Sequence, residues 1–294
     1  MRELTSPAVV RQIINSHGFK VRKALGQNFL LDANIIDKIV DAAHLTQKDL
    51  VFEIGPGLGV LTRRIAQSAG KVLAVEIDQN LLPILDETLG HLPNAEVVHG
   101  DALKINFDQL AADRTDKQFG PEGKAYKLVA NLPYYITTPI LMHMLTGGFN
   151  LDILVVMMQR EVAERLQASP GGKDYGSLSV AVQYYTVPEV VIRVPKTVFF
   201  PAPEVDSAVI RLTRRKVPPV TLISEETFFK VVRAAFGQRR KTLINSLTGS
   251  GLASKETWSE VLVETGINPT RRGETLSLDE FAALANTFEM SIRG

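Results

Sequence analysis

A glycine-rich turn between an apolar strand and a helix constrains the fold of this 294-residue chain more than any other feature. The run Leu50–Ile54 is almost entirely apolar, as in a buried strand, and residues 60–66 repeat apolar side chains with helical spacing. Between them stand Gly55, Gly57 and Gly59, which permit a tight turn and a close approach of the backbone to a ligand. This order predicts an α/β domain with a nucleotide-binding loop.

The glycine spacing argues against two common phosphate sites. The glycines alternate and do not follow the G-x-G-x-x-G spacing, so a pyrophosphate cradle is disfavoured. A Walker lysine is also missing, because Lys173 lacks the required glycine spacing and the Ser or Thr that should follow it. The loop therefore favours a ligand without phosphates.

Acidic residues follow the next two predicted strands. The strand 72–75 ends at Glu76, 21 residues after Gly55, and an acid at about this distance commonly binds ribose hydroxyls. Asp101 follows the strand 95–98, and its carboxylate can accept a hydrogen bond from an adenine amine. Either acid alone also fits a helix cap or a solvated surface. Together with the glycine loop they predict a site for S-adenosylmethionine, which has a ribose, an adenine and no phosphate.

A third motif follows the apolar strand Tyr126–Ala130. Asn131 offers a side-chain oxygen as an acceptor, and Tyr134 offers a ring on which a base can stack. Pro133 has no amide hydrogen, so the carbonyls of the turn can face a substrate amine. The alternative is a strand-ending turn whose proline and tyrosine only pack. Because ligands bind at the carboxyl ends of such strands, the motif predicts a site for a flat aromatic amine.

These motifs together resemble the ribosomal RNA adenine dimethyltransferase family, in the branch that modifies two adjacent adenosines near the 3′ end of small-subunit rRNA. The resemblance covers nearly the whole chain. It is carried by segments 26–30, 53–59, 75–78, 100–102, 131–134, 199–207 and 271–278. The first five are shared with methylases of large-subunit rRNA, and the last favours the small-subunit branch.

The resemblance implies an enzyme that dimethylates the exocyclic amines of both adenosines, in the 3′-terminal hairpin loop, with S-adenosyl-L-methionine as cofactor and with a role in small-subunit maturation. Cofactor contacts are implied at Asn28, Leu30, Gly55, Gly57, Glu76, Asp101 and Asn131, and catalytic positions at Asn131, Leu132, Pro133, Tyr134 and Phe199. Phe200 stands beside Phe199, so the choice of the second stacking ring stays open. The alternatives are a large-subunit rRNA methylase, a DNA adenine methylase and a non-catalytic RNA-binding assembly factor.

The expected fold is a Rossmann-like methyltransferase sheet, doubly wound with helices on both faces, followed by a small all-helical C-terminal domain. The first domain should span residues 1–215 and the helical domain 216–294, with Lys216–Pro219 as linker. A helix is expected over 177–185, and Ser224 should cap the first helix of the second domain.

Positive charge is concentrated in one part of the chain. The formal net charge is only +1, but residues 211–245 hold nine lysines and arginines against two glutamates. The clusters are Arg214–Lys216, Arg239–Lys241 and Arg271-Arg272. They predict docking to the phosphate backbone of 16S rRNA in a pre-ribosomal small subunit, although solvated helix faces would give the same pattern.

Other classes of site are disfavoured by composition. The chain has no cysteine, and its five histidines show no ligand pair, so neither disulfides nor a metal site is expected. Neither a signal peptide nor an apolar stretch long enough to span a bilayer is visible. We therefore expect a cytoplasmic monomer without a membrane segment.

Overall fold

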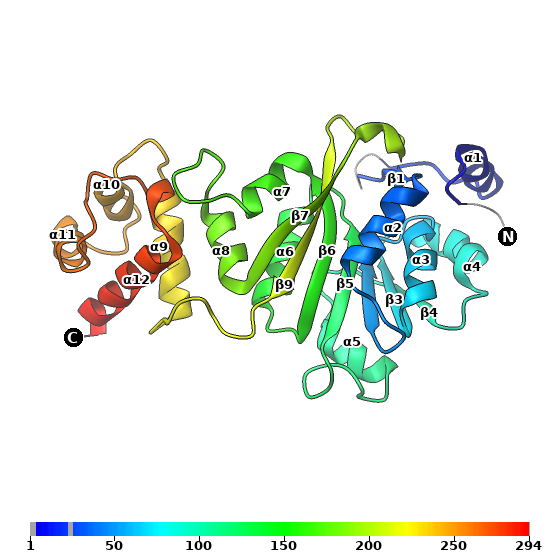
Figure 1. Ribbon diagram of the computed structural model, residues 1–294, viewed down its shortest axis with the longest axis horizontal. Helices are drawn as coiled ribbons and strands as arrows, with labels where there is room; N and C mark the ends of the chain where they lie inside the picture. Colours follow the sequence, from blue (N-terminus) through cyan, green and yellow to red (C-terminus); the bar gives the residue numbers. More distant parts are fainter. Residues whose placement is uncertain (1–3, 23–25, 294) are drawn as a thin grey trace. The chain divides into compact units, whose positions relative to one another are not determined.

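The computed structural model describes residues 4–22 and 26–293, and its largest element is a seven-stranded sheet (Figure 1). The strand order is β4-β3-β2-β5-β6-β9-β7, and the neighbours from β4 to β6 run parallel, whereas β9 is antiparallel to β6. The strands are β2 (Leu50–Ile54), β3 (Lys71–Glu76), β4 (Ala95–His99), β5 (Tyr126–Asn131), β6 (Leu151–Gln159), β7 (Thr186–Val194) and β9 (Ser207–Arg214).

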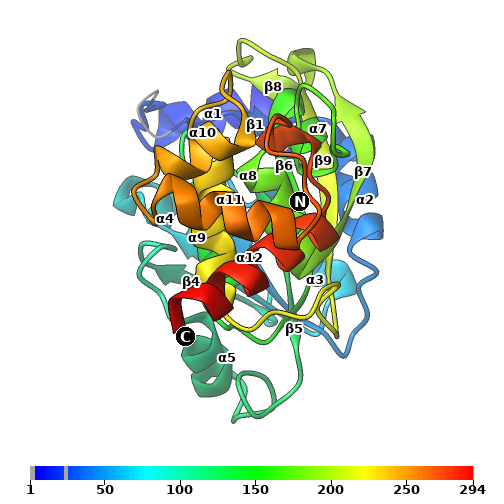
Figure 2. The same cartoon turned by 90° about the vertical axis from the view of Figure 1, so that its left-hand side faces the viewer.

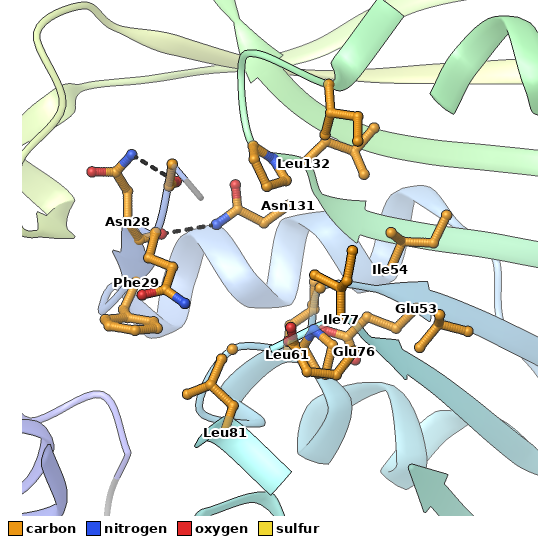
Figure 3. A pocket seen from close by; sticks show the side chains of 18 of the residues that line it. Asn28, Phe29, Glu53, Ile54, Leu61, Glu76, Ile77, Leu81, Asn131 and Leu132 are labelled. Atoms are coloured by element: carbon orange, nitrogen blue, oxygen red, sulfur yellow. Dashed lines mark hydrogen bonds between the residues drawn. The ribbon is translucent and has the colours of Figure 1, made fainter. Parts of the chain in front are cut away.

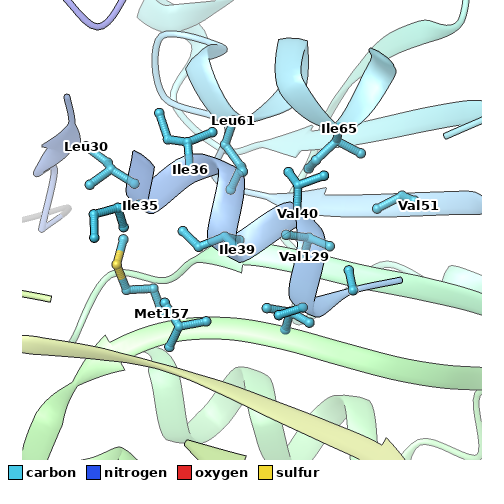
Figure 4. Packing of buried hydrophobic residues seen from close by; sticks show 14 of the residues in the cluster. Leu30, Ile35, Ile36, Ile39, Val40, Val51, Leu61, Ile65, Val129 and Met157 are labelled. Carbon is cyan, nitrogen blue, oxygen red and sulfur yellow. The ribbon is translucent and has the colours of Figure 1, made fainter. Parts of the chain in front are cut away.

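Helices cover both faces of this sheet, as the alternating sequence pattern predicts. Figure 4 shows how the apolar side of α2 (Ala33–Ala42) packs with α3 (Val60–Ser68) over β2, β5 and β6, where Ile39, Val51 and Val129 are fully buried. On the opposite face, the Phe52 ring meets the ring of Phe107 edge-on with centroids 5.1 Å apart. The remaining helices of this part are α1 (Pro7–Ser16), α4 (Leu82–Leu89), α5 (Phe107–Arg114), α6 (Thr137–Thr146) and α7 (Arg160–Leu166).

The order of the strands reverses at β2. The chain passes from β2 to β3 on one side and later adds β5 on the other side. In open α/β sheets this switch point opens a crevice beyond the carboxyl ends of the strands, where ligands bind. The glycine turn that follows β2 and residues 131–134, which begin with the last residue of β5, both lie at this crevice.

A small two-stranded sheet joins the N-terminal segment to the loop between β7 and β9. Strand β1 (Phe29–Leu30) pairs antiparallel with β8 (Phe199–Phe200), in the register Phe29↔Phe200 and Leu30↔Phe199. Segments that lie about 170 residues apart in the sequence are thus brought together.

The contacts divide the chain into two compact units, and the division differs from the predicted one. The first unit extends to Ala163 and includes Glu189–Arg214, whereas Glu164–Pro188 groups with the residues from Arg215 onward. The break at Arg214/Arg215 lies one residue from the expected boundary. The two divisions differ for 164–188, where the Tyr184 ring packs on Phe228, with centroids 5.4 Å apart.

The second unit is helical around an aromatic core. Figure 2 shows its helices, of which α9 packs against α10 and α12. The rings of Trp258 and Phe288 stack at 4.3 Å, and the Ser224 hydroxyl accepts a hydrogen bond from the Thr227 amide, which confirms the predicted cap. The helices are α8 (Ser177–Tyr185), exactly over the predicted range, α9 (Glu225–Phe236), α10 (Leu243–Thr248), α11 (Lys255–Glu264) and α12 (Leu278–Arg293). None of the helices in the described ranges is long and apolar enough to cross a membrane.

Candidate functional site

One pocket lies at the carboxyl ends of β2, β3 and β5 and is bordered by the β1 segment (Figure 3). Its walls are mostly apolar, with a few polar groups that converge on it, as is typical of small-molecule sites. The structure brings together every site residue predicted from the sequence: Asn28, Leu30, Gly55, Gly57, Glu76, Asp101, Asn131, Leu132, Pro133, Tyr134 and Phe199 all line it.

The glycine turn forms one wall of the pocket and needs glycine for two reasons. Gly55, Gly57 and Gly59 all have positive φ angles, which residues other than glycine rarely adopt. A Cβ on Gly57 would also lie 3.2 Å from the Phe29 ring, and one on Gly59 would lie 2.8 Å from Leu89 Cδ2. The alternating spacing therefore lets the turn fit beneath the β1 segment.

The two predicted acids stand at the ends of neighbouring strands. Glu76 is buried, and its Oε1 accepts a hydrogen bond from the Asp78 amide at 2.8 Å. Burial raises the pKa of Glu76, against the effect of nearby backbone amides and with a further contribution from the Asp78 charge. Asp101 Oδ1 accepts from the Leu103 amide at 3.0 Å, and Lys104 lies 3.7 Å from Oδ2.

The orientation of the Asn131 amide follows from one hydrogen bond. Asn131 Nδ2 donates to the carbonyl of Asn28 at 3.2 Å (Figure 3), so Oδ1 is left without a donor among the described residues. The β1 segment thereby positions an acceptor that belongs to β5. The site can present this neutral oxygen to a hydrogen-bond donor of a ligand.

The carbonyls of the proline turn differ from our expectation. Pro133 O is already occupied, since it accepts hydrogen bonds from the Ile136 amide at 3.2 Å and from Thr137 Oγ1 at 3.0 Å. These bonds start α6, which is why this carbonyl is directed into the helix. In contrast, no group in the described part of the chain donates to the Leu132 carbonyl. Of the acceptors at this turn, Pro133 O is therefore occupied, whereas Leu132 O has no donor within the described residues.

Two aromatic side chains predicted from the sequence, Tyr134 and Phe199, line the pocket. The Tyr134 hydroxyl is hydrogen-bonded to Ser207 Oγ at 2.7 Å, which fixes the ring. Burial raises the pKa of Tyr134, so the phenol is neutral at physiological pH. Phe199, which is 6% exposed, lines the pocket, whereas Phe200 does not. The Phe200 ring instead has the guanidinium carbon of Arg11 at 5.5 Å from its centroid.

Glu53 was not predicted as a site residue, yet it lies in the pocket wall. It is 1% exposed, and its Oε2 has no hydrogen-bond partner in the described ranges. Burial raises its pKa to about 8, Thr62 opposes this shift, and the charge of Glu76 adds to it. The signal in the sequence was a single acid inside an otherwise apolar strand that leads into glycines.

Several of the basic residues predicted to dock rRNA form hydrogen bonds or ion pairs with other residues of the chain. Arg214 Nη1 donates to Leu145 O, Arg215 Nε donates to Gln183 O, and Arg271 is paired with Glu280. Arg239 pairs with Glu274 at 3.5 Å and also donates to the Lys173 carbonyl. Three of the five basic residues at 239–241 and 271–272 are exposed and make no ion pair within the described residues. These are Arg240, Lys241 and Arg272.

Comparisons with known proteins agree on one family. The family model for ribosomal RNA adenine dimethylase matches residues 18–289. Ribosomal RNA small subunit methyltransferase A of Pelotomaculum thermopropionicum is 61% identical over 286 residues, which cover 97% of both chains. The protein of the same name from Moorella thermoacetica is 52% identical over 98% of this chain and 100% of its own.

Solved structures show the same fold. A dimethyladenosine transferase from Plasmodium falciparum superposes with a TM-score of 0.72 at 25% identity, over 87% of this chain and 95% of its own. The 23S rRNA methyltransferase ErmE superposes with a TM-score of 0.66 at 28% identity, over 89% of this chain and 100% of its own.

The raised pKa of Glu53 predicts a pH-dependent stability. Between pH 4.5 and about 8 the folded protein holds a proton that the unfolded chain has released, so stability falls as pH rises through this window. As pH rises from 5 to 9, the unfolding free energy of the wild type should decrease. For Glu53→Gln, which has no carboxyl to titrate, we expect this decrease to be smaller by roughly 3–5 kcal/mol. Denaturant titrations at several pH values measure this, with the exposed Asp152→Asn as control. Parallel profiles for wild type and Glu53→Gln would contradict the prediction.

Proposed function

The chain belongs to the ribosomal RNA adenine dimethylase family, and from this premise we propose the reaction and the roles of its residues. The protein is an S-adenosylmethionine-dependent rRNA adenine dimethyltransferase. It dimethylates the exocyclic amines of two adjacent adenosines in the 3′-terminal hairpin loop of small-subunit rRNA. The observation that carries this proposal is the single pocket that joins Glu76 and Asp101 with Asn131, Tyr134 and Phe199.

The small-subunit substrate is supported over the large-subunit alternative by the relatives. Two proteins named for the small subunit are 52% and 61% identical to this chain over nearly its whole length, whereas the 23S rRNA methyltransferase ErmE is 28% identical. A purely non-catalytic assembly role is disfavoured, because the acceptors and rings of the pocket are all present. We place the reaction in a pre-ribosomal particle in the cytoplasm, with the protein acting as a monomer and contributing to subunit maturation.

The donor set of the pocket fits S-adenosylmethionine. The Glu76 carboxylate can accept hydrogen bonds from ribose hydroxyls, and the Asp101 carboxylate can accept one from an adenine amine. Asn28, Leu30, Gly55 and Gly57 complete this part of the wall. When bound, the cofactor supplies an electrophilic methyl group on a positively charged sulfur. The buried carboxyls of Glu53 and Glu76 favour a cationic ligand over an anionic one.

The target adenine fits between Tyr134 and Phe199, where both ring faces can be stacked. The base must leave its own stack, or already lie in a loop, to enter the pocket. Asn131 Oδ1 and Leu132 O then accept the two amine hydrogens, and this holds the nitrogen with its lone pair directed away from the acceptors. Catalysis depends mainly on this positioning.

Neutral acceptors suit a reaction that occurs twice on the same nitrogen. After one transfer the amine has a single hydrogen to donate, and only one acceptor remains engaged. A neutral oxygen that loses its partner costs less than an unpaired buried charge. The amine becomes acidic once it is alkylated, so no residue of the pocket has to remove its proton beforehand.

Removing the Glu76 carboxylate tests the cofactor site. Glu76→Ala should weaken S-adenosylmethionine binding roughly ten- to a hundredfold, because a charge-assisted hydrogen bond contributes about 1.5–3 kcal/mol. Calorimetric titration measures the dissociation constant, and circular dichroism checks the fold. Asp152→Ala, an exposed acid on β6 of the same sheet, is the matched control. An unchanged constant for Glu76→Ala would remove Glu76 from the site.

Three substitutions test which aromatic rings stack on the target base. Tyr134→Ala and Phe199→Ala should each lower the rate of methyl transfer to small subunits roughly 5- to 150-fold, with little change in cofactor affinity. Phe200→Ala should retain transfer, because Phe200 does not line the pocket. Transfer of labelled methyl groups, followed by mapping of the modified bases, measures this. If Phe200→Ala fails while Phe199→Ala transfers normally, the assignment of the second ring is wrong.

The helical unit is proposed to dock the rRNA through its exposed cations. Because Arg239 is engaged internally, we expect Arg240 and Lys241 to contribute most of the effect of the cluster 239–241. Arg240→Ala/Lys241→Ala should make the salt dependence of small-subunit binding shallower by about 1.4–1.8 units, at about 0.7–0.9 per phosphate contact.

A salt titration of binding measures this slope. The control is Lys48→Ala/Lys117→Ala. It removes two exposed lysines that precede β2 and β5 in the sequence, whereas the pocket lies at the carboxyl ends of these strands. Cofactor affinity should not change in either double variant. Equal slopes for the wild type and Arg240→Ala/Lys241→Ala would show that these cations are an ordinary solvated face.

A further inference from the structure

Tyr135 is the one tyrosine of the chain that is largely exposed. Its side chain is 56% exposed, and yet it lines the pocket next to Tyr134. Within residues 4–22 and 26–293 it makes no hydrogen bond through its hydroxyl and no contact with another ring. An aromatic ring that is exposed to solvent and also lines a pocket has a face on which a nucleic-acid base can stack.

The backbone beneath this ring is held firmly. Pro133 O accepts the hydrogen bonds that start α6 on the C-terminal side of Tyr135. On the other side the N-terminal segment passes so closely that a Cβ on Gly26 would lie 3.5 Å from Tyr135 Cδ1 and 3.1 Å from Pro133 Cβ. Gly26 also has a positive φ of 61°. The ring therefore stands on a hydrogen-bonded turn, with a glycine where a Cβ would crowd Pro133 and touch the ring.

The proposed substrate has a base that needs such a surface. When one adenosine lies between Tyr134 and Phe199, the adjacent adenosine is one sugar–phosphate unit away and remains outside the pocket. Tyr135 follows Tyr134 directly, at the rim. Stacking on an aromatic side chain requires no particular base, so the same ring can serve whichever adenosine is the neighbour.

We propose that Tyr135 is a positioning residue that stacks on the nucleotide adjacent to the target adenosine. The proposal rests on the rRNA methyltransferase function above. Tyr135 would bind the RNA, and not the cofactor, and it would hold the target strand in register while the neighbouring base is modified. The competing interpretations are a solvated side chain without a role and a contact with the cofactor.

The test compares Tyr135→Ala, Tyr135→Phe and the exposed Val217→Ala on two substrates. One is the unmodified small subunit, and the other is a reconstituted subunit with an abasic nucleotide in place of one of the two adenosines. On the unmodified subunit, Tyr135→Ala should lower kcat/KM roughly 5- to 150-fold. Tyr135→Phe and Val217→Ala should stay close to the wild type, and the cofactor dissociation constant should not change.

The abasic substrate shows whether the loss depends on the neighbouring base. The wild type should lose activity on the remaining adenosine, and Tyr135→Ala should lose little more. The proposal is overturned if Tyr135→Ala equals the wild type on the unmodified subunit. It is also overturned if Tyr135→Ala lowers kcat/KM relative to the wild type as much on the abasic substrate as on the unmodified subunit. A decrease in cofactor affinity as large as the decrease in kcat/KM would overturn it as well. A wild-type protein that is inactive on the unmodified subunit would instead reject the proposed function, and this inference with it.

Discussion

The placement of β3 and β5 on opposite sides of β2 is the constraint on which the rest of the site depends. Because parallel strands end at the same edge of the sheet, this order brings three separate stretches of sequence to one crevice. The glycine turn comes from β2, Glu76 from β3 and Asn131 from β5. The packing of α2 and α3 over the sheet holds these strands in place, since their shared core is almost completely buried.

The pocket depends next on a segment from outside the sheet. The pairing of β1 with β8 places the Asn28 carbonyl where Asn131 Nδ2 can donate to it. That single bond leaves Oδ1 of the Asn131 amide as the acceptor for the proposed substrate. Gly57 has to be a glycine for the same reason, because the Phe29 ring of β1 occupies the space that its Cβ would need. A loss of this pairing would therefore alter both the proposed cofactor and target ends of the site.

The pocket combines desolvated acids with neutral acceptors, and the two serve different ligands. Glu53 and Glu76 are buried near each other, so their ionised forms are disfavoured unless positive charge is nearby. The proposed cofactor carries such charge. Around the proposed amine position the acceptors are an amide oxygen and a carbonyl, which bind hydrogens without a strong preference for a cation. The site thus separates charge attraction from the orientation of the reacting nitrogen.

The sequence by itself determined the fold class, the helix at 177–185, the Ser224 cap and the strand-end residues Gly55, Glu76, Asp101 and Asn131 that line the pocket. Each of these depends on local periodicity or on short motifs at strand ends, which a single segment can encode, whereas Asn28, Leu30 and Phe199 were implied by the family resemblance. Only the tertiary structure decided the grouping of 164–188 with the helical unit, the internal pairing of Arg215 and Arg271, and the occupied carbonyl of Pro133. It also separated Phe199 from Phe200 and revealed Glu53 in the pocket wall. These outcomes depend on which partner from a distant segment reaches each group, and neither charge nor hydrophobicity along the chain carries that information.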